Sequence, residues 1–245
     1  MNIIKIVKLK SGKYKLYLDN NETIITYDEV ILVNNLLFHK QIDNDTIKKI
    51  KDENNYYELM NKAVNYISKR LRSEKEINYY LNKQTKDIYM IDKIICELKN
   101  KHLIDDRNFT KAYINDKINL SNNGILKIKK DLQKLGVSKQ IIEEEIDNMK
   151  LKSDNNKLKK MIEKKIKSNN KYSSNYLKQK IINDMINLGY EKKEIINIIK
   201  NYQIDDSKTY QKEYDRLFNK LNKKYQGSEL EFQVRKRLIA KGFKK

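Results

Sequence analysis

The 245-residue sequence contains no proline and no tryptophan, and it has only six glycines, two histidines and one cysteine. Because proline and glycine are the commonest turn-forming residues, their scarcity favours helices along most of the chain. The single cysteine, Cys96, excludes an internal disulfide and fits a reducing compartment. It lies among isoleucines and a leucine, so we expect a buried structural thiol rather than a nucleophile.

Long apolar segments are also missing. No apolar run approaches the length that crosses a bilayer, and the first residues lack the uninterrupted apolar region of a signal peptide. The sequence therefore predicts a cytoplasmic protein without a membrane partner.

Residues for catalysis are scarce. His39, His102 and one cysteine cannot assemble a zinc site of the usual His/Cys type. The sequence has no phosphate-cradling G-x-x-x-x-G-K-[ST] loop, no G-x-S-x-G and no H-E-x-x-H. The pair Asp105–Asp106 is a conceivable Mg²⁺ ligand, but helix capping explains it more simply. We predict a protein that is not an enzyme and needs neither cofactor nor metal.

Positive charge is abundant. Lysine and arginine number 53 against 33 acidic residues, which gives a formal net charge of +20 and favours a polyanionic partner. An alternative stays open. The chain is rich in Lys, Asn, Ile and Tyr, whose codons are rich in A and T, so a biased genome is another source of the lysines.

The six arginines are more informative than the lysines. Four of them form two Arg-x-Arg pairs, Arg70 with Arg72 and Arg235 with Arg237. A guanidinium group binds phosphate or carboxylate through two parallel hydrogen bonds, which a lysine cannot do. The segment Ser207–Lys245, which includes the second pair, contains 12 basic and 4 acidic residues. We therefore expect the C-terminal segment to be the main anion-binding surface.

Eight residues are candidates for contacting nucleic acid or an acidic protein surface, and a solvated basic face without any ligand is the alternative for all of them. They are Arg70, Arg72, Lys127, Lys129, Lys130, Arg235, Lys236 and Arg237.

The N-terminal region differs from the rest of the chain. Apolar and polar residues alternate over Tyr14–Leu18 at the period of two typical of a half-buried strand. With turn signals on both sides, this pattern predicts a three-stranded meander over residues 1–27. Thr26 with Glu29 predicts a capping box, followed by one or two helices over 28–52 that pack on the strands.

Helical periodicity follows. An apolar stripe at three- and four-residue steps ends at Leu71. Ser73 with Glu76 then forms a capping box, so one helix ends and the next begins at once. A further helix is expected over 87–101, with Ile88 on its apolar face.

A repeat of 53 residues is the clearest internal feature. Two apolar residues one turn apart are followed by a glycine and another apolar residue, which is typical of a helix ending in a left-handed glycine cap. The three sets are Ile128-Leu132-Gly136-Val137, Ile181-Met185-Gly189-Tyr190 and Val234-Leu238-Gly242-Phe243.

Aspartates mark the beginning of each repeat. A carboxylate at a helix N-terminus accepts hydrogen bonds from unpaired backbone N–H groups and suits the helix dipole. We predict eight residues as structural caps. They are Ser73, the three repeat glycines Gly136, Gly189 and Gly242, and the four aspartates Asp105, Asp106, Asp154 and Asp206.

These patterns predict a mainly α fold of tandem three-helix repeats in an elongated, curved array, preceded by the small β-meander. The expected divisions are 1–53 for the meander plus helix, 54–105, 106–152 and 153–205 for three-helix repeats, and 206–245 for a truncated two-helix repeat.

One segment resembles a known family. The stretch from Ser68 to Ile77, which reads SKRLRSEKEI, is similar to the R-x-R-S-x-x-E-[LI] pattern of the RecX family. The stretch Leu103-Ile104-Asp105-Asp106 with Phe109 is similar to the family's G-L-I-D-D followed by an aromatic residue. Gly124, Leu132 and Gly136 fit its second repeat. The resemblance covers about residue 54 to the end, and His102 stands where the family usually has glycine.

The resemblance implies an inhibitor of the RecA recombinase. Members of the family bind the groove of the RecA–DNA filament and suppress ATPase, strand exchange and filament growth in recombination and DNA repair. It implies RecA filaments and single- and double-stranded DNA as partners, and we expect a monomer. A stand-alone DNA-binding protein held by phosphate contacts is the alternative, and a helical scaffold without a nucleic-acid role is a third. Charge alone does not separate them.

Overall fold

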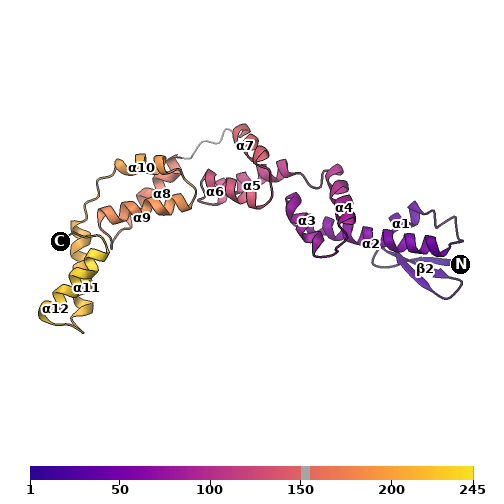
Figure 1. Cartoon of the computed structure of the whole chain (residues 1–245), viewed down its shortest axis with the longest axis horizontal. Coiled ribbons are helices and arrows are strands. Elements are labelled where there is room, and N and C mark those ends of the chain that lie inside the picture. Colours follow the sequence, from indigo (N-terminus) through magenta and orange to yellow (C-terminus); the bar gives the residue numbers. More distant parts are fainter. Residues whose placement is uncertain (150–154, 245) are drawn as a thin grey trace. The chain divides into compact units, whose positions relative to one another are not determined.

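The computed structural model of the chain describes residues 1–149 and 155–244 (Figure 1). Three strands come first, followed by helices. Contacts divide the chain into two compact units, which are described separately. Unit 1 is Met1–Phe109 with Leu135–Val137, and unit 2 is Thr110–Lys134 with Ser138–Lys245. The mainly α fold with an N-terminal β-meander is confirmed.

The strands are β1 (Ile3–Lys8), β2 (Tyr14–Leu18) and β3 (Thr23–Thr26). Within the described ranges the helices are α1 (Asp28–Val33), α2 (Asn44–Ile67), α3 (Glu74–Asn82), α4 (Ile88–Asn100), α5 (Asp106–Leu120), α6 (Ile125–Lys134), α7 (Lys139–Asn148), α8 (Asn155–Lys167), α9 (Ser174–Asn187), α10 (Lys192–Lys200), α11 (Ser207–Leu221) and α12 (Gly227–Ala240).

The N-terminal sheet is antiparallel, in the order β1-β2-β3. Leu16 and Leu18 point into the core of unit 1 and Tyr17 is exposed, as the alternation predicts. Val30 of α1 and Ile50 of α2 complete this small core. The sheet is therefore stabilised by the helices that follow it.

Two expectations for this region are wrong. Thr26 does not cap α1, because its hydroxyl is buried and donates a hydrogen bond to Oδ1 of Asn54 at 2.8 Å. The helices expected over 28–52 also do not end near residue 52, because α2 runs unbroken from Asn44 to Ile67. The local sequence does not show the role of Thr26, because its hydrogen-bond partner lies 28 residues away.

Residues 54–105 contribute a second apolar core to unit 1, formed by α2, α3 and α4. The capping box of Ser73 and Glu76 is present at the start of α3. Three expectations of burial are wrong, because Leu71, Ile88 and Cys96 are exposed. Leu71 lies beyond the end of α2 and Ile88 is the first residue of α4. Cys96 faces away from the buried stripe of α4, so its apolar neighbours in sequence are not its neighbours in space.

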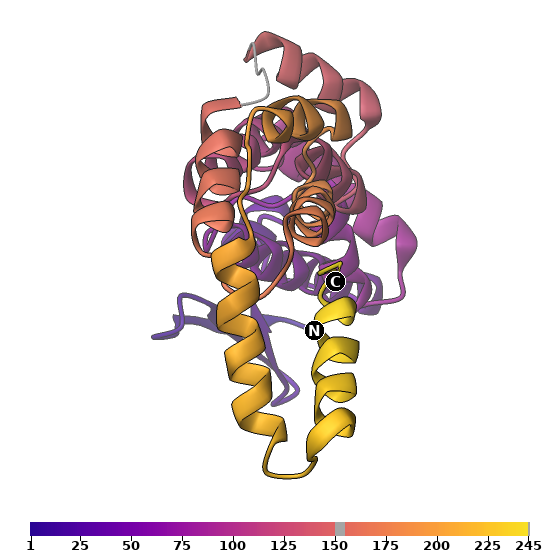
Figure 2. The same ribbon diagram turned by 90° about the vertical axis from the view of Figure 1, so that its left-hand side faces the viewer.

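Unit 2 holds an apolar core from α8, α9 and α10 and another from α11 and α12. Figure 2 shows α11 and α12 side by side as an antiparallel hairpin. The helices preceding the three repeat glycines end as the repeat predicts. Gly136, Gly189 and Gly242 have φ of +90°, +88° and +86°. The apolar residue after each glycine is buried. Tyr190 and Phe243 each share an apolar core with the helix that precedes them.

These helix ends also join neighbouring repeats. The carbonyl of the residue before each glycine accepts a hydrogen bond from the N-terminus of an earlier helix. The Ser73 hydroxyl donates to the Leu135 carbonyl at 2.6 Å, the Gly124 amide to Leu188 at 2.6 Å, and the Ser173 amide to Lys241 at 3.1 Å. Each pair lies within one unit. A hydrogen bond between equivalent positions thus recurs three times, although its donor is a hydroxyl at Ser73 and a backbone amide at Gly124 and Ser173.

The aspartate pairs have two separate partners. Asp105 accepts from the amide of Arg107 at 2.7 Å and caps α5, its own helix. Asp106 instead accepts from the Glu74 amide at 2.9 Å and caps α3, whose first residue lies 32 positions earlier. Burial raises the pKa of Asp106, although this hydrogen bond opposes the shift.

The second pair repeats this division. Asp205 accepts from the Ser207 amide at 3.0 Å, and Asp206 accepts from the Ser174 amide of α9 at 2.6 Å, again 32 positions earlier. The second aspartate of each pair therefore caps a helix of the previous repeat and links the two repeats by a hydrogen bond. Asp154, the remaining predicted cap, lies outside the described residues.

Candidate nucleic-acid interface

The most accessible cluster of predicted cations lies on α12. Val234 and Leu238 are buried against α11, one turn apart. Their burial fixes the rotation of the helix, so Arg235, Lys236 and Arg237 between them are exposed. Among the described residues, no ion pair or side-chain hydrogen bond engages these three cations. Their guanidinium and ammonium groups are therefore available to an external anion.

The hairpin of α11 and α12 has few accessible negative charges to offset this cluster. Glu213 is buried, with 1% of its surface exposed, and pairs with Arg216 at 2.6 Å and with Lys241. Asp215, Glu229 and Glu231 are exposed and keep their negative charge, but the exposed lysines and arginines of the hairpin outnumber them. The exposed charge of the hairpin is thus positive.

Glu213 is a structural anion. Burial acts to raise its pKa, but the hydrogen bonds from Arg216 and Lys241 outweigh burial and hold the pKa below its ordinary value. Lys241 precedes Gly242 at the end of α12. The ion pair therefore ties the end of α12 to the first half of α11.

Arg70 and Arg72 lie together at the start of α3, and both face Glu76. Arg70 donates to the Glu76 carboxylate at 2.5 Å, and Arg72 approaches it at 3.5 Å. The guanidinium of Arg72 also stacks on Tyr66, 3.8 Å from the ring centroid, and its side chain is 12% exposed. Burial acts to raise the pKa of Glu76, but the hydrogen bonds from Arg70 and the Ser73 amide, together with the charges of Arg70 and Arg72, outweigh burial and the pKa is lowered. Arg70 is the more accessible of the two, at 52% exposed.

The predicted lysines of α6 are divided among three environments. Lys127 is half-buried and lies against Gly189, and Lys129 pairs with Glu143 of α7 at 2.6 Å. Lys130 is exposed. Arg70 and Arg72 belong to unit 1, whereas the lysines of α6 and the α12 cluster belong to unit 2.

Sequence reasoning missed the cations of α8. This helix carries six lysines and one glutamate in 13 residues, and the chain continues with Lys171. The high local density of lysine in α8 was visible in the sequence. It did not stand out, because the whole chain is rich in lysine. Lys157 shows that the group is not uniform, because its ammonium donates to the carbonyls of Ile118 and Ser121 near the end of α5.

Other kinds of site find no support in the part of the chain that the structure describes. No group of three or more His, Cys, Asp or Glu side chains is placed to hold a metal ion in residues 1–149 and 155–244. No helix in these ranges is long and apolar enough to cross a membrane.

Comparison with known proteins gives consistent matches. Residues 105–145 match a family model described as RecX, second three-helix domain. The chain is 30% identical over 250 residues to a protein named regulatory protein RecX from Listeria welshimeri, covering 98% of this chain and 91% of that protein. A protein of the same name from Streptococcus agalactiae is 29% identical over 248 residues, covering 99% of this chain and 95% of the relative.

A solved structure shares the fold. The crystal structure of a regulatory protein RecX superposes with a TM-score of 0.71, covering 82% of this chain and 99% of that chain, at 21% sequence identity.

Proposed function

The chain belongs to the RecX family of regulatory proteins, and from this premise we propose that it inhibits the RecA recombinase by binding the RecA–DNA filament. In this proposal it lies in the filament groove as a monomer and suppresses ATPase, strand exchange and filament growth. Its role is non-enzymatic and depends on no cofactor. It acts in the cytoplasm, where the filament forms on single-stranded DNA and pairs with duplex DNA.

The observation that carries the proposal is the α12 cluster. Arg235, Lys236 and Arg237 are exposed on a helix whose opposite face is buried. Three cations that have no partner among the described residues suit the phosphates of DNA or acidic patches of the recombinase. With a net charge of +20, long-range attraction also accelerates encounter with a polyanionic filament.

The other predicted cations contribute unequally in this proposal. Arg70 and Lys130 are accessible and make direct contacts. Arg72, Lys127 and Lys129 are partly buried or paired, so they act mainly by shaping the surface. Replacing Arg72 is therefore expected to reduce stability as well as binding.

Charge reversal tests the assignment of the α12 cluster. We expect Arg235→Glu with Arg237→Glu to raise the concentration needed for half-inhibition of RecA ATPase by about tenfold or more, because two phosphate or carboxylate contacts become repulsive. The matched control is Lys192→Glu with Lys193→Glu, which makes the same charge change at exposed positions of α10. Equal loss in both variants would show that total charge, not the cluster, determines inhibition.

The stand-alone DNA-binding protein is the second candidate function, and the same unpaired cations favour it. The two candidates differ in salt dependence. Binding through phosphates alone weakens with a log–log slope of about −0.9 per neutralised phosphate on duplex DNA. Binding to a filament should fall less steeply and should require RecA.

A further inference from the structure

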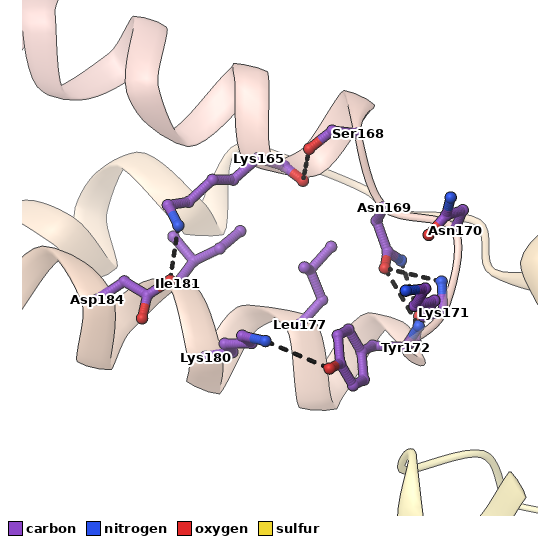
Figure 3. A pocket seen from close by; sticks show the side chains of 10 residues that line it. All are labelled: Lys165, Ser168, Asn169, Asn170, Lys171, Tyr172, Leu177, Lys180, Ile181 and Asp184. Atoms are coloured by element: carbon purple, nitrogen blue, oxygen red, sulfur yellow. Dashed lines mark hydrogen bonds and ion pairs between the residues drawn. The ribbon is translucent and has the colours of Figure 1, made fainter.

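A small basic pocket lies in unit 2, where α8 ends and the chain turns into α9 (Figure 3). Its volume is about 180 Å³. Leu177 and Ile181 of α9 form an apolar floor and are buried. Three lysines, Lys165, Lys171 and Lys180, surround this floor with a single carboxylate, Asp184.

The charges of the pocket are only partly compensated. Lys165 pairs with Asp184 at 2.6 Å, so these two groups neutralise each other. Lys180 donates to the hydroxyl of Tyr172 at 3.3 Å and lies 4.5 Å from the centroid of its ring. The ammonium of Lys171 has no ion pair with any described residue. The pocket therefore keeps the charge of two exposed lysines.

The loop that carries Lys171 is fixed by Asn169. The Asn169 side-chain oxygen accepts from the amides of Lys171 at 3.4 Å and Tyr172 at 3.2 Å, and its amide group donates to the Tyr172 carbonyl at 2.8 Å. Figure 3 shows these hydrogen bonds between Asn169 and the residues that follow it. Because the loop is already ordered, a ligand would meet Lys171 and Tyr172 at a reduced entropic cost.

Aromatic rings adjoin the cations. Tyr172 stacks on Tyr176, with ring centroids 5.0 Å apart and planes inclined by 18°. Tyr176 is 44% exposed. A basic rim next to an accessible aromatic ring is the combination with which proteins bind single-stranded nucleic acid, because lysines contact the backbone and bases stack on the rings.

We propose that this pocket binds one phosphate group of a single-stranded polynucleotide, held by Lys171 and Lys180, with an adjacent base against Tyr176. At about 180 Å³ the cavity is smaller than the roughly 300–1,000 Å³ of small-molecule sites, which favours one group of a polymer over a free nucleotide. The inference rests on the proposed function for the expectation that DNA is the polyanion. It goes beyond that function by assigning a site separate from the α12 cluster.

The test measures binding of the full chain to a fluorescent oligothymidylate by anisotropy over a salt series. We expect Lys171→Gln with Lys180→Gln to weaken binding about tenfold and to make the log–log salt slope shallower by about 0.7, since the two lysines hold one phosphate and each neutralised phosphate on a single strand contributes about 0.7. The control, Lys160→Gln with Lys167→Gln, removes the same charge from exposed positions of α8 outside the pocket. Equal weakening by both pairs would overturn the proposal.

The aromatic part is tested with Tyr176→Leu, which keeps an apolar side chain against Gly242. We expect about fivefold weaker binding to oligothymidylate and no change with an abasic oligonucleotide of equal length. Equal effects on both oligonucleotides would remove base stacking from the proposal. If the lysine variant instead loses binding to a polyglutamate peptide and keeps oligothymidylate binding, the pocket serves an acidic protein and the proposal is wrong.

Inhibition of RecA ATPase, measured with the same variants, separates this inference from the proposed function. If Lys171→Gln with Lys180→Gln leaves both oligonucleotide binding and RecA inhibition at the wild-type level, only the proposed role of the pocket is overturned. A pocket variant that loses oligonucleotide binding, in a protein that never inhibits RecA, supports the pocket and overturns the proposed function.

Discussion

A left-handed residue ends several helices of this chain, and in one case it is not glycine. His102 has a φ of +54° at the end of α4. Its amide donates to the Lys99 carbonyl and the Leu103 amide to Leu98. Gly189 and Tyr190 make the same two hydrogen bonds at the end of α9. His102 therefore forms the same helix end that glycine forms at Gly189, at an energetic cost.

Replacing this histidine should stabilise the protein. We expect His102→Gly to raise the free energy of unfolding by up to about 1 kcal/mol, because the left-handed conformation is strained for a residue with a Cβ. Urea unfolding of both proteins measures the difference. Asn100→Gly, in the last turn of α4, should lower stability, and a gain there would contradict the explanation.

Gly189 combines a left-handed backbone with close packing. A Cβ at this position would overlap the backbone nitrogen of Lys127, which belongs to the preceding repeat. Gly12 has a similar φ of +84°, but a Cβ there meets no atom within 4 Å. Substitution of Gly12 therefore measures the free-energy cost of the left-handed backbone alone. Substitution of Gly189 measures that cost together with the cost of the steric overlap.

Alanine at these two positions should have unequal effects. We expect Gly12→Ala to cost about 1 kcal/mol and Gly189→Ala to cost at least about 2 kcal/mol more, since the junction between repeats must open. The measurement is thermal or urea unfolding of each variant. Equal losses would mean that the close contact at Gly189 adds nothing.

At the scale of elements, side chains from one repeat stabilise helices of another. Asp106 and Asp206 each cap a helix that begins 32 positions earlier. We expect Asp206→Ala to destabilise the start of α9 by about 1–2 kcal/mol and to accelerate exchange of the Ser174 amide proton. Asp206→Asn keeps an acceptor oxygen and should retain most of the protection. Unchanged exchange in the alanine variant would refute this role.

The buried ion pair of α11 and α12 predicts a pH dependence. The pKa of Glu213 is lowered in the folded chain from its ordinary 4.5. Its contribution to stability is therefore complete above that value and is lost as the pH falls through the lowered pKa. We expect Glu213→Gln to be less stable than wild type at pH 7, because Lys241 loses its anion, and the difference to shrink as the pH falls through the lowered pKa of Glu213. A pH-independent difference would contradict this explanation.

Local patterns predicted the elements well. The alternation over Tyr14–Leu18 and the capping box at Ser73 were sufficient to place strand β2 and helix α3, because both signals are contained in a few neighbouring residues. Thr26 and Cys96 were misjudged because their surroundings depend on segments distant in sequence or on the rotation of a helix.

The candidate interface was predictable only in part. Sequence identified the exposed cations of α12, but it did not reveal that Glu76 engages Arg70 and Arg72. The pocket of Lys171 and Lys180 was also hidden, because its lysines come from a loop and a helix that only the fold brings together. Charge can be counted in a sequence, whereas its compensation depends on tertiary structure.

At the scale of the whole molecule, the net charge of +20 dominates. It attracts any polyanion and is screened by salt, so binding at low ionic strength alone says little about function. Specific inhibition of a filament must instead persist near physiological salt and at amounts too small to coat the DNA.

The most direct test is the ATPase activity of RecA on single-stranded DNA, titrated with this protein at substoichiometric amounts and near-physiological salt. We predict loss of activity well before the protein could cover the DNA. If activity persists until the protein saturates free DNA, the chain acts by competing for phosphates, and the proposal of a filament inhibitor is contradicted.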